Sequence, residues 1–137
     1  MIKPHKKPKK KRNQTIGYWQ RKADKKLQEI CRTMYQEEGC LVCGGEYACS
    51  HHFQPKSRST HLRYNIRNLI PICHKHHMAH HSGDSRIHAI IILYKGEEWL
   101  ETLLREEKAH RYTKAGYKYY RDMYERLCII EPLKLKV

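Results

Sequence analysis

Two short cysteine and histidine pairs constrain this 137-residue chain more than any other feature of its sequence. Cys40 and Cys43 are separated by two residues and followed by two glycines, and Cys73 and His76 repeat the spacing about thirty residues later. Two intervening residues let both members of a pair reach one ion from a tight turn, and two such pairs complete the closed Cys3His tetrahedron of structural zinc. The pattern therefore predicts a zinc-stabilised segment.

Two neighbouring residues offer alternative ligands. Cys49 could supply a substitute thiolate, but it has no partner at the two-residue spacing, so we expect it to pack on a strand. His74 could replace His76, although the gap that separates Cys73 from His76 favours His76. In a reducing cytosol, paired cysteines at short spacing bind metal more often than they form disulfides.

The charge of the chain points to a polyanionic partner. Lysine and arginine total 28 residues against 14 aspartates and glutamates, and the formal net charge is +14. This excess excludes an ordinary near-neutral enzyme acting on cations and favours nucleic acid or an anionic membrane surface. Residues 47–83 contain no aspartate or glutamate, and eight of the eleven histidines lie between His51 and His81. The composition predicts a cationic, metal-rich centre.

Hydrophobic periodicity divides the chain into a tail and one α+β domain. Residues 1–14 are predicted to be a disordered basic tail, because lysine, arginine and proline dominate them. Residues 15–39 follow a helical period, residues 40–82 a hairpin and a short helix, and residues 83–137 a helical extension. The apolar run over residues 89–94 could form a strand instead of a helix. It is far below the roughly 18 residues needed to cross a bilayer, so we expect no membrane partner.

A second group of histidines remains after the zinc ligands are assigned. His77 and His81 stand four residues apart, so a helix would present both imidazoles on one face, at the spacing of a bidentate metal ligand. His51 and His52 are adjacent on a predicted strand, where neighbouring side chains point to opposite faces. We expect one of these two to complete a metal site and the other to face a substrate.

These residues resemble a known family over residues 40–82. The motif reads His51-His52-Phe53-Gln54-Pro55, then Asn68-Leu69, then Cys73-x-x-His76-His77-x-x-x-His81. It is similar to the HNH endonucleases of the ββα-metal, or His-Me finger, superfamily.

The resemblance implies a zinc-stabilised ββα-metal core flanked by helices. It implies that His51, His77 and His81 hold a catalytic divalent ion. His52 would be the general base that deprotonates the attacking water. Asn68 would position the loop that bears this base or ligate the metal.

Two positions depart from the family pattern. Many members have aspartate where this chain has His51, and an all-imidazole set suits Zn²⁺, Ni²⁺, Co²⁺ or Mn²⁺ better than Mg²⁺. The catalytic ion is therefore left open among Mg²⁺, Mn²⁺, Ni²⁺ and Zn²⁺. The last structural ligand is usually cysteine where this chain has His76, and imidazole also binds zinc.

A looser resemblance covers more of the chain. It is carried by Tyr18-Trp19, Arg63-Tyr64, Ser82-Gly83-Asp84 and the helical C-terminal third. These features are similar to phage recombination proteins of the NinG/Rap kind. The resemblance implies action on branched or structured DNA during recombination, in the cytoplasm of a bacterial or phage-infected cell, with recombination proteins as partners.

Basic side chains around the predicted site are candidates for binding DNA phosphates. They are Lys56, Arg58, Arg63, Arg67 and Lys75. The last helix is also basic and aromatic, and Tyr112 and Tyr119 lie off its apolar face, where they could contact DNA.

We therefore expect a metal-dependent DNA endonuclease, with a homodimer favoured because one metal centre cuts one strand. A zinc-stabilised DNA-binding or recombination adaptor protein without catalysis is the alternative, but it leaves the second histidine group unexplained. A colicin-like toxin nuclease shares the motif, although it would ordinarily be one domain of a longer chain.

Overall fold

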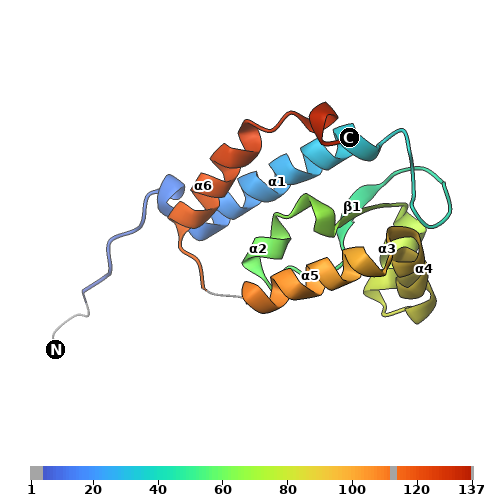
Figure 1. Ribbon diagram of the computed structural model, residues 1–137. Coiled ribbons are helices and arrows are strands. Elements are labelled where there is room, and N and C mark those ends of the chain that lie inside the picture. The colour runs from blue at the N-terminus through green and yellow to red at the C-terminus, as the bar shows by residue number, and fades with distance from the viewer. Residues whose placement is uncertain (1–4, 112–113, 137) are drawn as a thin grey trace.

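The computed structural model describes residues 5–111 and 114–136. The first long helix forms one side of the molecule. α1 (Ile16–Tyr35) begins after Thr15, whose side chain accepts a hydrogen bond from the backbone N–H of Tyr18. α6 (Tyr117–Cys128) lies alongside α1 (Figure 1). The buried residues of α1 are Ala23, Leu27, Ile30, Cys31 and Met34. The predicted helix and its apolar stripe are confirmed over this range.

A two-stranded antiparallel sheet stands between two groups of helices. β1 (Cys49–His52) pairs with β2 (Leu69–Ile72), in a register that sets His52 opposite Leu69. All of β2 is buried, and its successive side chains enter different cores. Leu69 packs with α1 and α6, whereas Ile70 packs with the helices on the other side, as the two-residue period of a strand requires.

Short elements connect the two strands and lead into a helical hairpin. α2 (Thr60–Arg63) and the 3-10 helix η2 (Ile66–Asn68) lie between β1 and β2. α3 (His74–His81) follows β2 directly, and α4 (Ser85–Lys95) follows after Asp84, whose carboxylate caps it by accepting from the Arg86 N–H.

The C-terminal part is helical, as predicted. The isoleucine-rich run falls within α4, so the helix prediction is confirmed over the strand alternative; Ile87 and Ile91 are buried one turn apart. α5 (Glu97–Ala109) and the 3-10 helix η3 (Pro132–Lys136) complete the elements described here.

The predicted tail is described only in part. Residues 5–11 carry no regular secondary structure, and Arg12–Gln14 form the 3-10 helix η1. Residues 1–4 lie outside the described part of the chain, as does Tyr112. Within the described ranges, no helix combines the length and apolarity needed to cross a membrane.

Candidate metal centres

The two predicted pairs converge into one cluster beside the start of α3. The ligand atoms of Cys40, Cys43, Cys73 and His76 all lie within 4.8 Å of one another. The Cys43 and Cys73 sulfurs are 3.9 Å apart, and the Cys40 sulfur is 3.7 Å from Nδ1 of His76. Tetrahedral zinc with bonds of about 2.3 Å to sulfur sets its ligands roughly 3.8 Å apart. The cluster is thus compatible with a structural metal such as zinc.

The turn that carries the first pair depends on glycine. Gly39 has φ +76°, and a Cβ atom there would lie 2.4 Å from the carbonyl oxygen of Gly45. That same carbonyl accepts a hydrogen bond of 2.9 Å from the Cys40 N–H, while the Gly44 N–H donates to the Cys40 carbonyl at 2.8 Å. A side chain at Gly39 would therefore disrupt the turn that presents Cys40.

The environment of Cys40 favours its metal-binding form. Burial opposes ionisation of this thiol, but backbone hydrogen bonds at Cys73 and Cys43 and a side-chain bond with His76 outweigh burial and lower its pKa to about 6. A thiolate, not a thiol, binds metal. Cys49 lies outside this cluster, and burial raises the pKa of its thiol.

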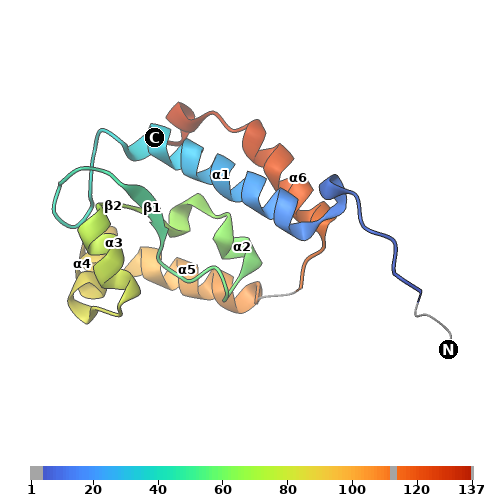
Figure 2. The same ribbon diagram turned by 180° about the vertical axis from the view of Figure 1, so that it is seen from behind.

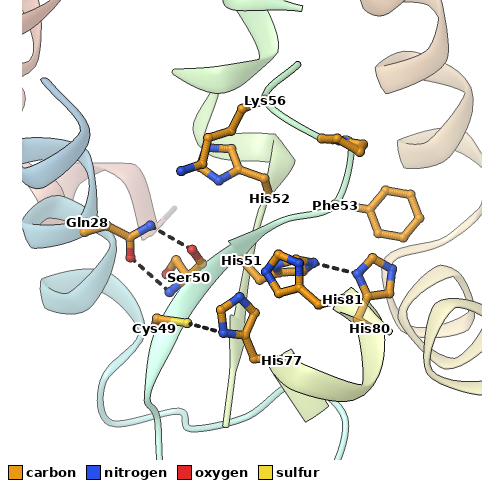
Figure 3. Close-up of a pocket in the computed structure, with 11 residues that line it drawn as sticks. Gln28, Cys49, Ser50, His51, His52, Phe53, Lys56, His77, His80 and His81 are labelled. Carbon is orange, nitrogen blue, oxygen red and sulfur yellow. Dashed lines mark hydrogen bonds between the residues drawn. The ribbon is translucent and has the colours of Figure 1, made fainter. Parts of the chain in front are cut away.

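Three further histidines meet on the other side of α3. His51 reaches them from β1, while His77 and His81 come from consecutive turns of α3, and their ligand atoms lie within 4.8 Å of one another. The ring centroid of His51 is 4.7 Å from that of His77 and 4.9 Å from that of His81. Figure 3 shows the three rings converging. The donors can bind a divalent ion of borderline softness.

Burial keeps two of these imidazoles, those of His51 and His77, neutral. Desolvation, reinforced by the neighbouring histidines, lowers the pKa of His51 to about 3. Burial likewise lowers the pKa of His77. Neutral imidazole is the form that ligates metal, so near neutral pH these side chains need not lose a proton before they bind an ion.

The three histidines line a pocket of about 410 Å³, here called the histidine pocket. His52 and Lys56 also line it, and none of its described lining residues is an aspartate or glutamate. Gln28 of α1 closes one side: its amide donates to the Ser50 carbonyl at 2.8 Å and accepts from the Ser50 N–H at 3.1 Å. No local pattern in the sequence identifies Gln28, because its place beside β1 depends on packing between distant segments.

His52 projects away from the three-histidine cluster, toward α2 (Figure 3). Its Nε2 lies 2.8 Å from the backbone carbonyl oxygen of Arg63. A carbonyl can only accept, so this bond places the proton on Nε2 and leaves Nδ1 able to take up another proton. Burial lowers the pKa of His52 to about 4, while the bond to the Arg63 carbonyl acts in the opposite direction.

Asn68, the last residue of η2, is fully buried directly before β2. Its Oδ1 accepts a bond of 2.8 Å from the Gln54 N–H, and its Nδ2 donates to the Gln54 and Leu62 carbonyls at 3.0 and 3.1 Å. The two bonds with Gln54 join the two ends of the segment between β1 and β2, and the third ties Asn68 to α2. Of the two roles expected for Asn68, these contacts fit the positioning of the loop.

Three histidine contacts around the cluster were not anticipated. His80 lies against His51, with 2.5 Å between Nδ1 of His80 and Nε2 of His51, and its Nε2 lies 3.1 Å from Nδ1 of His88. The Cys49 sulfur lies 3.4 Å from Nδ1 of His77. His88 is on α4, so only the turn between α3 and α4 brings it to His80.

The predicted phosphate-binding side chains separate in the structure. Lys56 lines the histidine pocket, and exposed Lys75 lies on α3. Arg58 is exposed and lies 3.6 Å from a carboxylate oxygen of Glu107. Arg67 is elsewhere, beside α5, where its carbonyl accepts a bond of 2.8 Å from the Trp99 indole N–H.

Arg63 requires a correction to the sequence-based expectation. Its guanidinium makes two bonds to the carboxylate of Asp24, of 3.0 and 2.6 Å, and its side chain is only 16% exposed. The paired carboxylate occupies the donors that a phosphate would need. Arg63 thus joins α2 to α1 and is not available as a phosphate contact.

One comparison with known proteins gives a match. The family described as "NinG: Bacteriophage Lambda NinG protein" matches residues 2–130. Comparison with curated proteins and with solved structures gives no significant match.

Proposed function

Because the chain belongs to the bacteriophage lambda NinG protein family, a family related to phage recombination, we propose that it is a metal-dependent DNA endonuclease that cuts branched or structured DNA. The observation that carries the proposal is the histidine pocket. There His52 lines the same pocket as three possible metal ligands, His51, His77 and His81, and no described lining residue carries negative charge. The strand–strand–helix order of β1, β2 and α3 supports assignment to the HNH group.

Each side chain has a role that follows from its position. Nδ1 of His52 accepts the proton of the attacking water, while its Nε2 is held by the Arg63 carbonyl. The lowered pKa keeps His52 neutral and able to accept a proton, and a phosphodiester anion brought beside it raises that pKa. Lys56 contacts the phosphate. Asn68 is a positioning residue that holds the loop carrying Lys56.

The three-histidine cluster would hold the catalytic ion. A divalent ion bound there supplies charge neutralisation on the phosphate and stabilises the leaving 3′ oxygen. The all-imidazole donor set favours Zn²⁺, Ni²⁺, Co²⁺ or Mn²⁺ over Mg²⁺. Zinc at the Cys40–Cys43–Cys73–His76 cluster would be structural. The two-site assignment requires two ions per chain.

The test is cleavage of supercoiled plasmid and of four-way-junction DNA by the zinc-loaded protein, with Mg²⁺, Mn²⁺, Ni²⁺ or Co²⁺ added. We expect cutting with at least one ion and its loss in His52→Ala, because that variant lacks the proton acceptor. The matched control is His74→Ala, since His74 is exposed on α3 and belongs to neither cluster. Equal cutting by His52→Ala and the unaltered protein would contradict the proposal.

The alternative is a zinc-stabilised DNA-binding or adaptor protein without catalysis. It predicts DNA binding with one tightly held ion per chain and no cleavage under any of the four metals.

In the endonuclease proposal, the protein works in the cytoplasm of an infected cell with recombination proteins, and two copies act together to cut two strands. Sedimentation with and without junction DNA measures that stoichiometry.

A further inference from the structure

A second hollow lies away from both metal clusters, where α2, the end of α5 and α6 meet. It measures about 580 Å³, and we call it the α5–α6 pocket. Its lining includes His61, Lys108, His110, Arg111, Tyr119 and Arg126. The proposed cleavage chemistry uses none of them.

The walls of this pocket are anchored by hydrogen bonds. The fully buried Ser59 donates from its hydroxyl to the His110 carbonyl at 2.6 Å. Asn65 donates to the carboxylate of Glu106 at 2.5 Å. These two bonds fasten the C-terminal end of α5 to the segment around α2. The pocket is therefore set by tertiary contacts and not by a single loop.

The charge of the pocket suits an anion. Lys108, Arg111 and Arg126 all line it, and its described lining residues include no aspartate or glutamate. Two carboxylates lie beside it: Glu106 lies 3.8 Å from Nε2 of His61, and Glu107 lies 3.6 Å from Arg58. Three cations thus face the hollow.

Aromatic rings give the pocket a second property. The rings of His61 and His110 stack with centroids 4.2 Å apart and an interplanar angle of 25°. Tyr119 is 36% exposed, with Ala115 and Met123 beside it in the lining. Rings interspersed with cations are the combination that binds unpaired nucleotides, because a base stacks on a ring while its phosphate meets a cation. A regular duplex keeps its bases stacked inside and cannot use these rings.

The α5–α6 pocket connects to the histidine pocket along one loop. Lys56 lines the histidine pocket, and two residues later Arg58 shares a third hollow with Glu107, Lys108 and Arg111. Lys108 and Arg111 also line the α5–α6 pocket. Figure 2 shows the loop running from β1 to α2 beside α5. Basic side chains therefore line the surface between the two pockets, with Glu107 paired to Arg58 among them.

We propose that the α5–α6 pocket binds an unpaired nucleotide of the DNA strand whose neighbouring duplex occupies the histidine pocket. The proposal rests on the proposed function, and it names the feature by which that site would select forked or branched DNA. Stacking on Tyr119 and the histidine pair holds the base, and Lys108, Arg111 and Arg126 hold the adjoining phosphates.

The test is fluorescence anisotropy of the full, zinc-loaded chain with three labelled DNAs: a single strand, a fork with unpaired arms and a blunt duplex. Tyr119→Ala and the double variant Lys108→Ala/Arg126→Ala are expected to bind the single strand and the fork about tenfold more weakly. Binding to the blunt duplex is expected to stay within about twofold. Matched controls are Tyr94→Ala, on an exposed tyrosine of α4, and Lys25→Ala, on exposed α1 surface.

Two results would overturn this inference: unchanged fork binding by both variants, or an equal loss on the fork and the blunt duplex, which would mark a non-specific basic patch. Circular dichroism of each variant confirms folding, and the double variant changes only exposed side chains. Binding is measured without added catalytic metal. A protein that cuts no DNA but shows the expected fork dependence would therefore refute the endonuclease and retain the nucleotide pocket.

Discussion

His80 stands directly behind His51, with Nδ1 of His80 2.5 Å from Nε2 of His51. Its other ring nitrogen faces His88 at 3.1 Å, and the His88 ring stacks on Phe53 with centroids 4.7 Å apart. A histidine that binds metal ordinarily donates its second N–H to a carboxylate, a carbonyl or water. In this chain the partner that contacts Nε2 of His51 is another imidazole, which carries no negative charge.

The first prediction follows from this contact. His80→Phe is expected to weaken Ni²⁺ binding at the three-histidine cluster by about 10- to 100-fold, because His51 loses its orienting partner. His80→Gln, which keeps a hydrogen-bonding group, is expected to restore part of the loss. Calorimetric titration of zinc-loaded protein with Ni²⁺ measures both variants. Wild-type affinity in His80→Phe would show that His80 does not orient His51.

The second prediction concerns the structural cluster. Cys73→Ser is expected to lower the free energy of unfolding by several kcal/mol, since binding energy at a structural zinc site is folding energy. Urea unfolding followed by circular dichroism measures it. Cys128→Ser is the control, because Cys128 is exposed and belongs to neither cluster. Equal stability of the two variants would exclude a structural ion at this cluster.

The third prediction concerns Asn68. Asn68→Ala leaves the Gln54 N–H and two buried carbonyls without their partner, and is expected to cost about 3 kcal/mol of unfolding free energy. Asn13→Ala, on an exposed side chain near α1, is expected to change stability by less than about 0.5 kcal/mol. Urea titration of both variants measures their unfolding free energies. A loss in Asn68→Ala as small as in the control would show that the loop does not depend on this amide.

The fourth prediction is a pH dependence. The pKa values of His51 and His52 are lowered to about 3 and about 4 from 6.5 in the unfolded chain. At pH values between the folded and unfolded pKa values, the unfolded chain binds more protons than the folded chain. The stability contributed by neutral His51 and His52 is therefore fully present above pH 6.5 and is lost as the pH falls toward 4. Each buried histidine costs up to about 1.4 kcal/mol per pH unit in that window.

Urea unfolding at pH 7 and pH 5 measures this loss. His52→Asn is expected to show a shallower decline than the unaltered protein, because one depressed titration is removed. Protons also compete with metal for His51, so a bound ion adds to the loss of stability at low pH. Equal unfolding free energies at the two pH values would contradict the prediction.

Much of the architecture could be predicted from local patterns. The stripe that includes Ala23, Leu27 and Ile30 identified α1, because helical periodicity is a property of neighbouring residues. The two clusters of possible metal ligands were also predicted as groups. Cys40 lies close to Cys43 because one tight turn separates them, and His77 lies close to His81 because one helical turn separates them. The sequence did not reveal that Arg63 is paired with Asp24.

The sequence by itself determined the ligand types, their local spacing, the helices and the absence of carboxylates from residues 47–83. Tertiary structure alone decided that His80 and His88 stand behind His51, that Gln28 covers β1, and that α5 and α6 enclose a basic, aromatic pocket. The physical reason is the separation along the chain over which each kind of interaction acts. Backbone geometry relates residues a few positions apart, whereas contacts between separate elements depend on how buried faces pack across the whole domain.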